Sequence, residues 1–241
     1  MKSIDIFVAA HKPCKIQTKD PAYKMIQVGA IGKEHFSLLT DDMYEDNISS
    51  KNYTYCELTA MYHIWKHSNA DIKGLCHYRR YFTSHQYLSE ALRYTLKKYP
   101  FILTGIKIEK ILNSYDLIVG IHPHKNKTDF DYYKEHHIIS DLLCVKSVIE
   151  ELYPDYISSF EECLNSDNFY LANMLYAPKE IFDAYSKWLF DILFEVEKRI
   201  DLAGRDDYQK RALGFLSERL LKVWVMKNNL NPYIGYIIRI L

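Results

Sequence analysis

The sequence predicts an α/β domain with a mainly parallel or mixed sheet and a helical C-terminal part. Apolar runs of strand length alternate with helical patterns through the first two-thirds of the chain. Two long helical patterns then follow, with no further strand between them. The length of 241 residues fits a single domain, residues 1–241, with one hydrophobic core.

The N-terminal part contains one clear strand, a long connection and one clear helix. Residues 4–9 form a compact apolar run, which predicts a strand. Residues 11–52 are polar and irregular, and a connection of this length is usually functional or disordered. A helix over 54–67 follows, because apolar residues recur at helical intervals and Thr54 and Glu57 have the spacing of a capping box.

The rest of the chain alternates short strands with helices. Apolar runs predict strands over 72–77, 101–104, 117–121 and 169–176. Helical periodicity predicts helices over 90–98, 130–152, 157–164, 178–200 and 208–227. Pro100 ends the first of these helices, and Pro178 suits the first position of the fourth. The apolar tail 233–241 is expected to be a last core strand or helix, with peripheral membrane docking as the alternative.

The composition excludes several classes of protein. Lysine and arginine number 31 and so do aspartate and glutamate, which argues against a dedicated nucleic-acid binder. Aromatic residues make up 15% of the chain, more than a disordered chain carries. The five cysteines include no C-x-x-C pair, which argues against a disulfide framework and favours a reducing cytoplasm. Neither a signal peptide nor a transmembrane helix is expected, and G-x-S-x-G, Walker and G-x-G-x-x-G patterns do not occur.

The most informative polar segment is His77–Arg80, directly after the expected strand 72–77. Ligands bind at the carboxyl ends of strands in open α/β sheets. Guanidinium groups are costly to bury without an anionic partner, and they bind phosphate oxygens in pairs. Arg79 and Arg80 therefore indicate a phosphate or diphosphate site. The alternative is that one arginine is solvated and the other pairs with a carboxylate of the core.

An acidic stretch, residues 40–49, allows two interpretations. Its carboxylates can hold a divalent cation or accept hydrogen bonds from ribose hydroxyls and a base N–H. Alternatively it is a solvated acidic loop, and Asp41 and Glu45 are taken as solvated charge.

Histidine spacing gives only a weak metal signal. His122 and His124 are two residues apart and His136 is adjacent to another histidine, whereas a zinc helix of the H-E-x-x-H type needs i, i+4 spacing. Glu218 and Arg219 are adjacent on the last long helical pattern, where they either form a structural pair or reach the cleft.

Several blocks together resemble a bacterial family of capsular and exopolysaccharide biosynthesis glycosyltransferases, long listed as a domain of unknown function. The HYRRYF block (77–82) and the GFLSERL block (214–220) are long and specific. The other matching blocks are IFVAAHK (6–12), QVGA (27–30), DNIS (46–49), CELTAMYHIWK (56–66), YDLIV (115–119), DYYKEHH (131–137) and NMLYAPKEIFDAYSKWLF (173–190).

This resemblance implies a GT-A-like, Rossmann-like fold that transfers a sugar from a nucleotide-diphosphate sugar, with a UDP-sugar as the expected donor. The implied acceptor is a growing capsular, exopolysaccharide or O-antigen glycan, free or lipid-linked, at the cytoplasmic face of the membrane. Residues 1–125 would then bind the nucleotide sugar, and the mostly helical residues 126–241 would form the acceptor side.

Many GT-A enzymes hold Mn²⁺ or Mg²⁺ with an Asp-x-Asp motif at the end of a strand, where this chain has His77–Arg80. The bare pattern occurs at 129–131, after no clear strand. Our hypothesis is that Arg79 and Arg80 replace part of the work of the cation. No metal ligand is assigned, and dependence on Mn²⁺ or Mg²⁺ stays open.

The roles expected from chemistry and position fall into three groups. The groups expected on the nucleotide or its phosphates are His11, Lys12, His77, Tyr78, Arg79 and Arg80. The groups expected on ribose, base or donor-sugar hydroxyls are Asp42, Asp46 and Asn47. The candidates for the catalytic base are Asp167 and Glu218, with His136 as a third. The alternatives are a non-catalytic nucleotide-sugar or glycan-binding module, a metal-dependent hydrolase built on His122, His124 and His136, and a helical scaffold protein.

Overall fold

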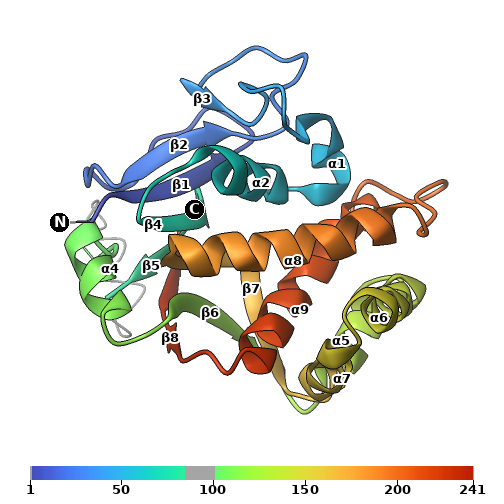
Figure 1. Cartoon of the computed structure of the whole chain (residues 1–241). Coiled ribbons are helices and arrows are strands. Elements are labelled where there is room, and N and C mark those ends of the chain that lie inside the picture. The colour runs from blue at the N-terminus through green and yellow to red at the C-terminus, as the bar shows by residue number, and fades with distance from the viewer. Residues whose placement is uncertain (1, 85–100, 241) are drawn as a thin grey trace.

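The computed structural model describes residues 2–84 and 101–240, which fold around a nine-stranded mixed sheet (Figure 1). Its strands are β1 (Ile4–Ala10), β2 (Tyr23–Gln27), β3 (Leu39–Thr40), β4 (Ile72–His77), β5 (Arg80–Thr83), β6 (Leu117–Pro123), β7 (Asn168–Pro178), β8 (Pro232–Ile234) and β9 (Tyr236–Arg239). The main strand order is β3-β2-β1-β4-β7-β6-β8, and β5 joins β4 to β9. The strands β3, β2, β1 and β4 run parallel, whereas β7 is antiparallel to both of its neighbours.

Helices pack on the sheet, and further helices lie beyond it on one side (Figure 1). They are α1 (Asn52–Tyr55), α2 (Leu58–His67), α4 (Gly105–Leu112), α5 (Asp129–His136), α6 (Ile139–Leu152), α7 (Ile157–Leu164), α8 (Lys179–Glu197) and α9 (Ala212–Lys227). Short 3₁₀ turns precede α1, α7 and α9, at Ser49–Lys51, Pro154–Tyr156 and Gln209–Arg211. The mixed α/β sheet with a helical C-terminal part confirms the fold class expected from the sequence.

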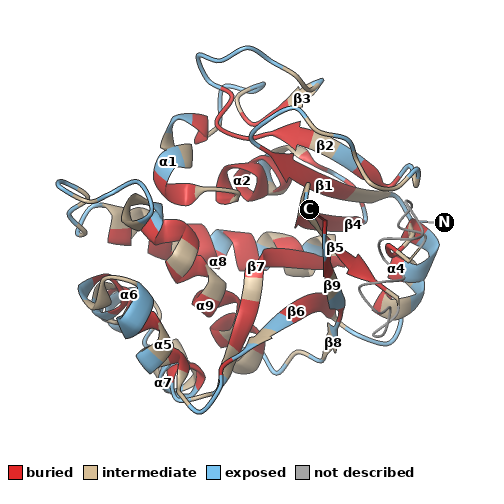
Figure 2. Cartoon of the chain, turned by 180° about the vertical axis from the view of Figure 1, so that it is seen from behind, coloured by how far each residue is buried: buried red, intermediate tan, exposed pale blue. Residues whose placement is uncertain are grey.

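The two faces of the sheet belong to different apolar clusters, as strand alternation requires. On β1, Phe7 belongs to the cluster that includes residues of α2, α6, α7, α8 and α9, whereas Ile6 and Val8 belong to the cluster that includes residues of α4, β5 and β9. Burial is concentrated in β1, β4, β7 and the long helices α8 and α9 (Figure 2). The polar residues at the ends of these central strands are therefore positioned by elements that are themselves well packed.

Several boundaries differ from the sequence-based expectation. The connection 11–52 contains β2 and β3, which are short parallel strands. Residues 101–104 do not form a strand: Ile102 makes one isolated bridge to Thr83, and α4 follows at once. The expected helix 90–98 lies outside the described residues. The tail forms strands β8 and β9, as one of its two interpretations predicted.

The expected helix over 54–67 is broken in two, and the expected capping box is wrong. Thr54 lies inside α1, and the side chain of Glu57 makes no capping hydrogen bond at the start of α2. The chain turns at Cys56, which has a positive φ of 52°, a backbone conformation that residues other than glycine rarely adopt. Because of this turn, Glu57 lines a pocket instead of capping the helix.

Candidate active site

A pocket of about 690 Å³ lies at the carboxyl ends of β1 and β4. His11 follows β1, and His77 ends β4. Because β1 and β4 are parallel and adjacent, their ends meet at one edge of the sheet. The opposite wall comes from the turn between α1 and α2, including Glu57, and from the start of α9, including Glu218. The sequence blocks 77–82 and 214–220 therefore contribute side chains to one pocket.

A bulge in β7 aims backbone groups into this pocket. The register with β6 shifts between Val119 and Ile121, so that β7 carries extra residues there. Within the bulge, Ala172 and Asn173 have positive φ values of 65° and 51°. Strained backbone of this kind is concentrated at functional sites. The N–H and the C=O of Ala172 both bind side chains of the pocket as a result.

Glu218 is a half-buried acid of the pocket. The backbone N–H of Ala172 donates to its Oε1 at 2.6 Å, and Nη1 of Arg219 lies 3.3 Å from its Oε2. The pKa of Glu218 is raised to about 7: burial raises it most and the nearby carboxylate of Glu57 adds to the rise, whereas Arg219, the N–H of Ala172 and Arg80 oppose it. A carboxyl group with a pKa near neutrality can accept a proton from a substrate hydroxyl. Glu218 meets both expectations from the sequence, since it pairs with Arg219 and also reaches the pocket.

The raised pKa of Glu218 predicts a pH-dependent gain in stability on its replacement. The folded state binds this proton more tightly than the unfolded state, so stability falls as the pH rises from the ordinary glutamate pKa to about 7. We expect Glu218→Gln to unfold at higher urea concentration than the wild-type chain at about pH 8, with a gain of up to roughly 3 kcal/mol that disappears near pH 4. A gain of equal size at both pH values would contradict this.

Three guanidinium groups line the pocket, and none of them forms an ion pair with a carboxylate anywhere in the described part of the chain. These are Arg79, Arg80 and Arg211. Arg79 is exposed and lies 5.1 Å from the Tyr78 ring, and Arg80 is half-buried at the start of β5. Nε of Arg211 donates to Sγ of Cys56 at 3.2 Å. Unpaired guanidinium groups around one cavity indicate an anionic ligand.

The remaining predicted phosphate-site residues lie near these arginines. The ring of His11 meets the Tyr78 ring edge-on, and the Lys12 ammonium lies 5.9 Å from the same ring, although Lys12 does not line the pocket. Burial and then the charges of Lys12 and Arg79 lower the pKa of His11. His77 donates from Nε2 to the carbonyl of Ala172 at 2.7 Å, and burial lowers its pKa, so that its ring is held neutral and fixed.

The acidic stretch lies outside the pocket. Asp42 faces His35 at 3.6 Å, Asp46 accepts from the hydroxyl of Tyr62 at 2.6 Å, and the side chain of Asn47 bonds to the backbone of its own loop. The expectation of solvated charge at Asp41 is wrong: its buried carboxylate accepts from the N–H groups of residues 29 and 30 and from a serine hydroxyl. These contacts shape the loop beside the pocket.

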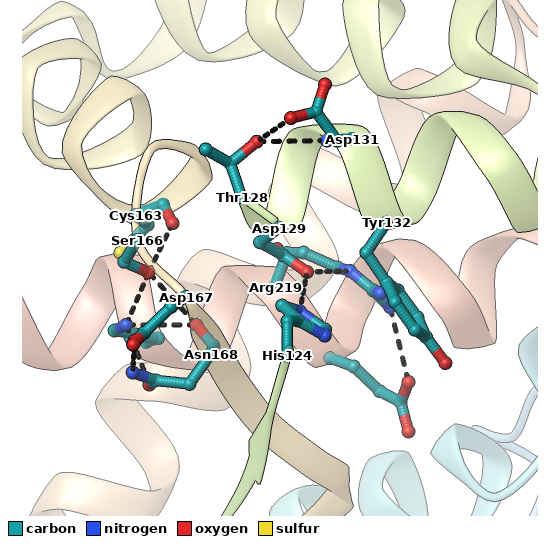
Figure 3. Close-up of polar contacts among 12 residues, drawn as sticks. His124, Thr128, Asp129, Asp131, Tyr132, Cys163, Ser166, Asp167, Asn168 and Arg219 are labelled. Carbon is teal, nitrogen blue, oxygen red and sulfur yellow. Dashed lines mark hydrogen bonds and ion pairs between the residues drawn. The ribbon is translucent and has the colours of Figure 1, made fainter. Parts of the chain in front are cut away.

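The other two candidate bases also lie away from the pocket lining. Asp167 accepts from the side-chain amide of Asn168, and its backbone carbonyl accepts from the N–H of His124 (Figure 3). His136 is exposed, and its Nδ1 bonds to the backbone carbonyl of Tyr132. Of the three candidates, Glu218 alone belongs to the pocket.

Residues of the sequence patterns considered as metal ligands form hydrogen bonds with other protein side chains. The side chain of His124 bonds to Asp129 at 3.0 Å, and Asp131 bonds to Thr128 at the start of α5 (Figure 3). Within residues 2–84 and 101–240, no group of three or more His, Cys, Asp or Glu side chains is arranged to hold a metal ion. The described residues therefore do not form a complete protein-built metal site.

Glu57 and Arg211 are among the pocket residues that the sequence did not single out as site residues. Oε1 of Glu57 accepts from the side-chain amide of Asn173 at 2.8 Å and lies 3.9 Å from Nε2 of His77. Glu57 lies in block 56–66, one of the blocks that resemble the glycosyltransferase family, and this was the sequence feature that could have indicated it. The capping-box spacing of Glu57 with Thr54 indicated a structural role instead.

The fold and the pocket define an α/β chain with an arginine-lined cleft at the carboxyl ends of parallel strands. The chain belongs to the DUF4422 family, described as a domain of unknown function, which it matches over residues 5–229. A search of curated proteins gave no match.

Among solved structures, the chain is similar to the apo structure of the WbbM bifunctional glycosyltransferase. The two share 27% sequence identity with a TM-score of 0.86, over 99% of this chain and 45% of that one. The chain thus spans less than half the length of this relative. No helix in the described part of the chain is long and apolar enough to cross a membrane.

Proposed function

We propose that this chain is a glycosyltransferase domain that moves a sugar from a nucleotide-diphosphate sugar onto a growing capsular, exopolysaccharide or O-antigen glycan. The observation that carries the proposal is the set of unpaired guanidinium groups of Arg79, Arg80 and Arg211 around a cavity that also holds Glu218. The similarity to one part of a bifunctional glycosyltransferase supports it. Residues 1–125 would supply most of the donor site, and residues 126–241 the acceptor side.

Arg79 and Arg80 would bind the diphosphate of the donor. Guanidinium groups present paired N–H donors to phosphate oxygens and remain charged at any working pH. As the bond between the sugar and the diphosphate breaks, negative charge grows on the leaving oxygen, and fixed cations beside it lower the barrier. We take a UDP-sugar as the donor, with His11 beside the nucleotide.

Glu218 would act as the general base in a transfer with inversion. Its carboxylate takes the proton of an acceptor hydroxyl while the hydroxyl oxygen bonds to the anomeric carbon of the donor sugar. The nucleoside diphosphate leaves with the electron pair of the broken bond. The N–H of Ala172 and the guanidinium of Arg219 hold the carboxylate, and Glu218 lines the cavity.

The acceptor would enter past Tyr53 and Tyr208, which line the pocket and are 57% and 51% exposed. Aromatic faces in the open suit the apolar faces of sugar rings. We expect Tyr208→Ala to raise the KM for the acceptor about tenfold while the KM for the donor stays unchanged, a loss that corresponds to about 1.4 kcal/mol. Tyr115→Ala, at an exposed tyrosine outside the pocket, is the control. A rise in the donor KM alone would contradict this arrangement.

The test is a thermal-shift screen of nucleotides and nucleotide sugars, followed by product analysis with the donor that binds. Binding to the folded state alone raises Tm with ligand concentration. We expect one nucleotide-diphosphate series to raise Tm, and release of the nucleoside diphosphate when a glycan acceptor is added. Binding without any transfer or donor hydrolysis would instead identify a non-catalytic module. The cytoplasmic location and contact with a lipid-linked acceptor stay predictions.

A further inference from the structure

Arg219 is buried next to Glu218 but does not line the pocket. It is 2% exposed and is among the largest fully buried side chains in the described part of the chain. Its guanidinium carbon lies 4.0 Å from the centroid of the Phe169 ring and 5.1 Å from that of Tyr133. A buried cation is retained only where its partners compensate for lost hydration, so its contacts identify its role.

The guanidinium of Arg219 lies near two carboxylates, one of which is that of Asp129 (Figure 3). Nε of Arg219 is 3.4 Å from Oδ1 of Asp129, and Nη1 is 3.3 Å from Oε2 of Glu218. Nη1 also donates to the backbone carbonyl of Phe215 at 3.0 Å, which fixes the guanidinium plane against α9. Oδ1 of Asp129 is held in turn by Nε2 of His124 at 3.0 Å. The contacts form one path from the start of α5 to the pocket.

Both carboxylates compete for the charge of Arg219. Asp129 is 2% exposed, so its interaction with the guanidinium is little screened by water. The charge that Asp129 balances is no longer available to stabilise the ionised form of Glu218. The other groups that act on Glu218 are Glu57 beside α2, Arg80 on β5 and the N–H of Ala172 on β7. Around Arg219 itself lie the rings of Tyr132 and Tyr133 on α5, and the nearby His122 and His137.

We propose that Arg219 is a positioning residue, which holds the Glu218 carboxylate in the pocket, and that Asp129 sets how much of the Arg219 charge reaches Glu218. The importance of this device for catalysis rests on the proposed function, but the device itself does not. It explains why an arginine and an aspartate that do not line this pocket are buried together behind a pocket carboxylate.

The proposal predicts opposite effects for the two partners. Arg219→Met removes the cation and keeps an apolar side chain of similar length, so the pKa of Glu218 rises. Asp129→Asn keeps the shape and removes the competing charge, so the pKa of Glu218 falls. We expect shifts of about one pH unit in each direction, which is a tenfold change in proton affinity. A purely structural role would produce no such opposition.

The experiment is a carbon-13 NMR titration of the glutamate carboxyl groups in the folded chain, with the Glu218 signal assigned by its loss in Glu218→Gln. It needs no substrate, so it separates this proposal from the proposed function: opposite shifts in a chain that transfers no sugar still support the positioning role. Arg205→Met is the matched control, because it breaks the buried Arg205–Asp141 ion pair away from the pocket and is expected to leave the Glu218 midpoint unchanged.

Equal midpoints in all variants, or shifts of the same sign in both, overturn the proposal. If Arg219→Met does not fold, Arg219→Lys replaces it. Lysine keeps the charge but not the planar group that contacts both carboxylates. The Glu218 midpoint in Arg219→Lys is therefore expected to rise by less than half of the shift of about one pH unit expected on full loss of the charge, whereas Asp129→Asn still lowers the midpoint. An unchanged midpoint in Asp129→Asn then overturns the proposal by itself.

Discussion

Glu218→Gln is expected to lower the rate of sugar transfer by a factor of about 10²–10⁴, the usual contribution of a general base. Glutamine keeps the size of the side chain and can still pack between the N–H of Ala172 and Arg219, but its amide cannot take a proton. Donor binding is expected to change far less than the rate, because the diphosphate contacts belong to other side chains. The measurement is kcat with saturating donor and acceptor.

The pH dependence provides an independent check on the same residue. Because the pKa of Glu218 is raised to about 7, the rate in the wild-type chain is expected to rise as the pH increases through about 7 and then level off. Glu161→Gln is the control, since Glu161 is exposed and pairs with Lys146 on the far helices. A Glu218→Gln chain that turns over within threefold of the wild-type rate would remove Glu218 from the mechanism.

Arg80→Ala is expected to weaken the binding of the nucleoside diphosphate about 10- to 100-fold and to lower kcat about 10²-fold or more. Hydrogen bonds from a charged donor contribute about 1.5–3 kcal/mol, and fixed cations act most strongly on charge that develops as the donor breaks. Arg80 is half-buried and unpaired within the described residues, so its removal leaves no carboxylate without its partner. The fold is therefore expected to survive.

The control for this prediction is Arg199→Ala. Arg199 forms ion pairs with Glu151 and Glu195 at the end of α8, and it lies outside the pocket lining. It is expected to leave both binding and turnover unchanged. If Arg80→Ala binds the nucleoside diphosphate as tightly as the wild-type chain does, the diphosphate is not held where we place it.

The sequence was most informative where the pattern and the local structure agree. The strand at 72–77 and the helix at 157–164 occur where periodicity predicted them, because both elements are amphipathic or buried over their whole length. The helix α4 was missed although its apolar residues recur at helical spacing. The short strand β2 lies in a mainly polar connection and is stabilised by its pairing with β1, a tertiary contribution that the local pattern does not contain.

The candidate site was found only in part for the same reason. Arg79 and Arg80 come directly after β4 and His77 ends it, and all three line the pocket, as expected for residues at the carboxyl end of a strand. Their role in binding phosphate stays a prediction. The contribution of Arg211 depends on how α9 packs against the turn at Cys56, and the bulge at Ala172 depends on pairing between two strands. Neither long-range contact has a signature in the sequence, whereas Asp167 met the chemical requirement but points elsewhere.

Calorimetric titration of UDP and uridine into the wild-type chain and into the Arg79→Ala, Arg80→Ala double variant tests the diphosphate site most directly. The predicted result is that UDP binds the wild-type chain much more tightly than uridine does, and that the double variant loses this preference. Because each charge-assisted contact contributes about 1.5–3 kcal/mol, the preference should fall by at least 100-fold. Equal affinity of both proteins for UDP, or no preference for UDP over uridine in the wild-type chain, would contradict the account.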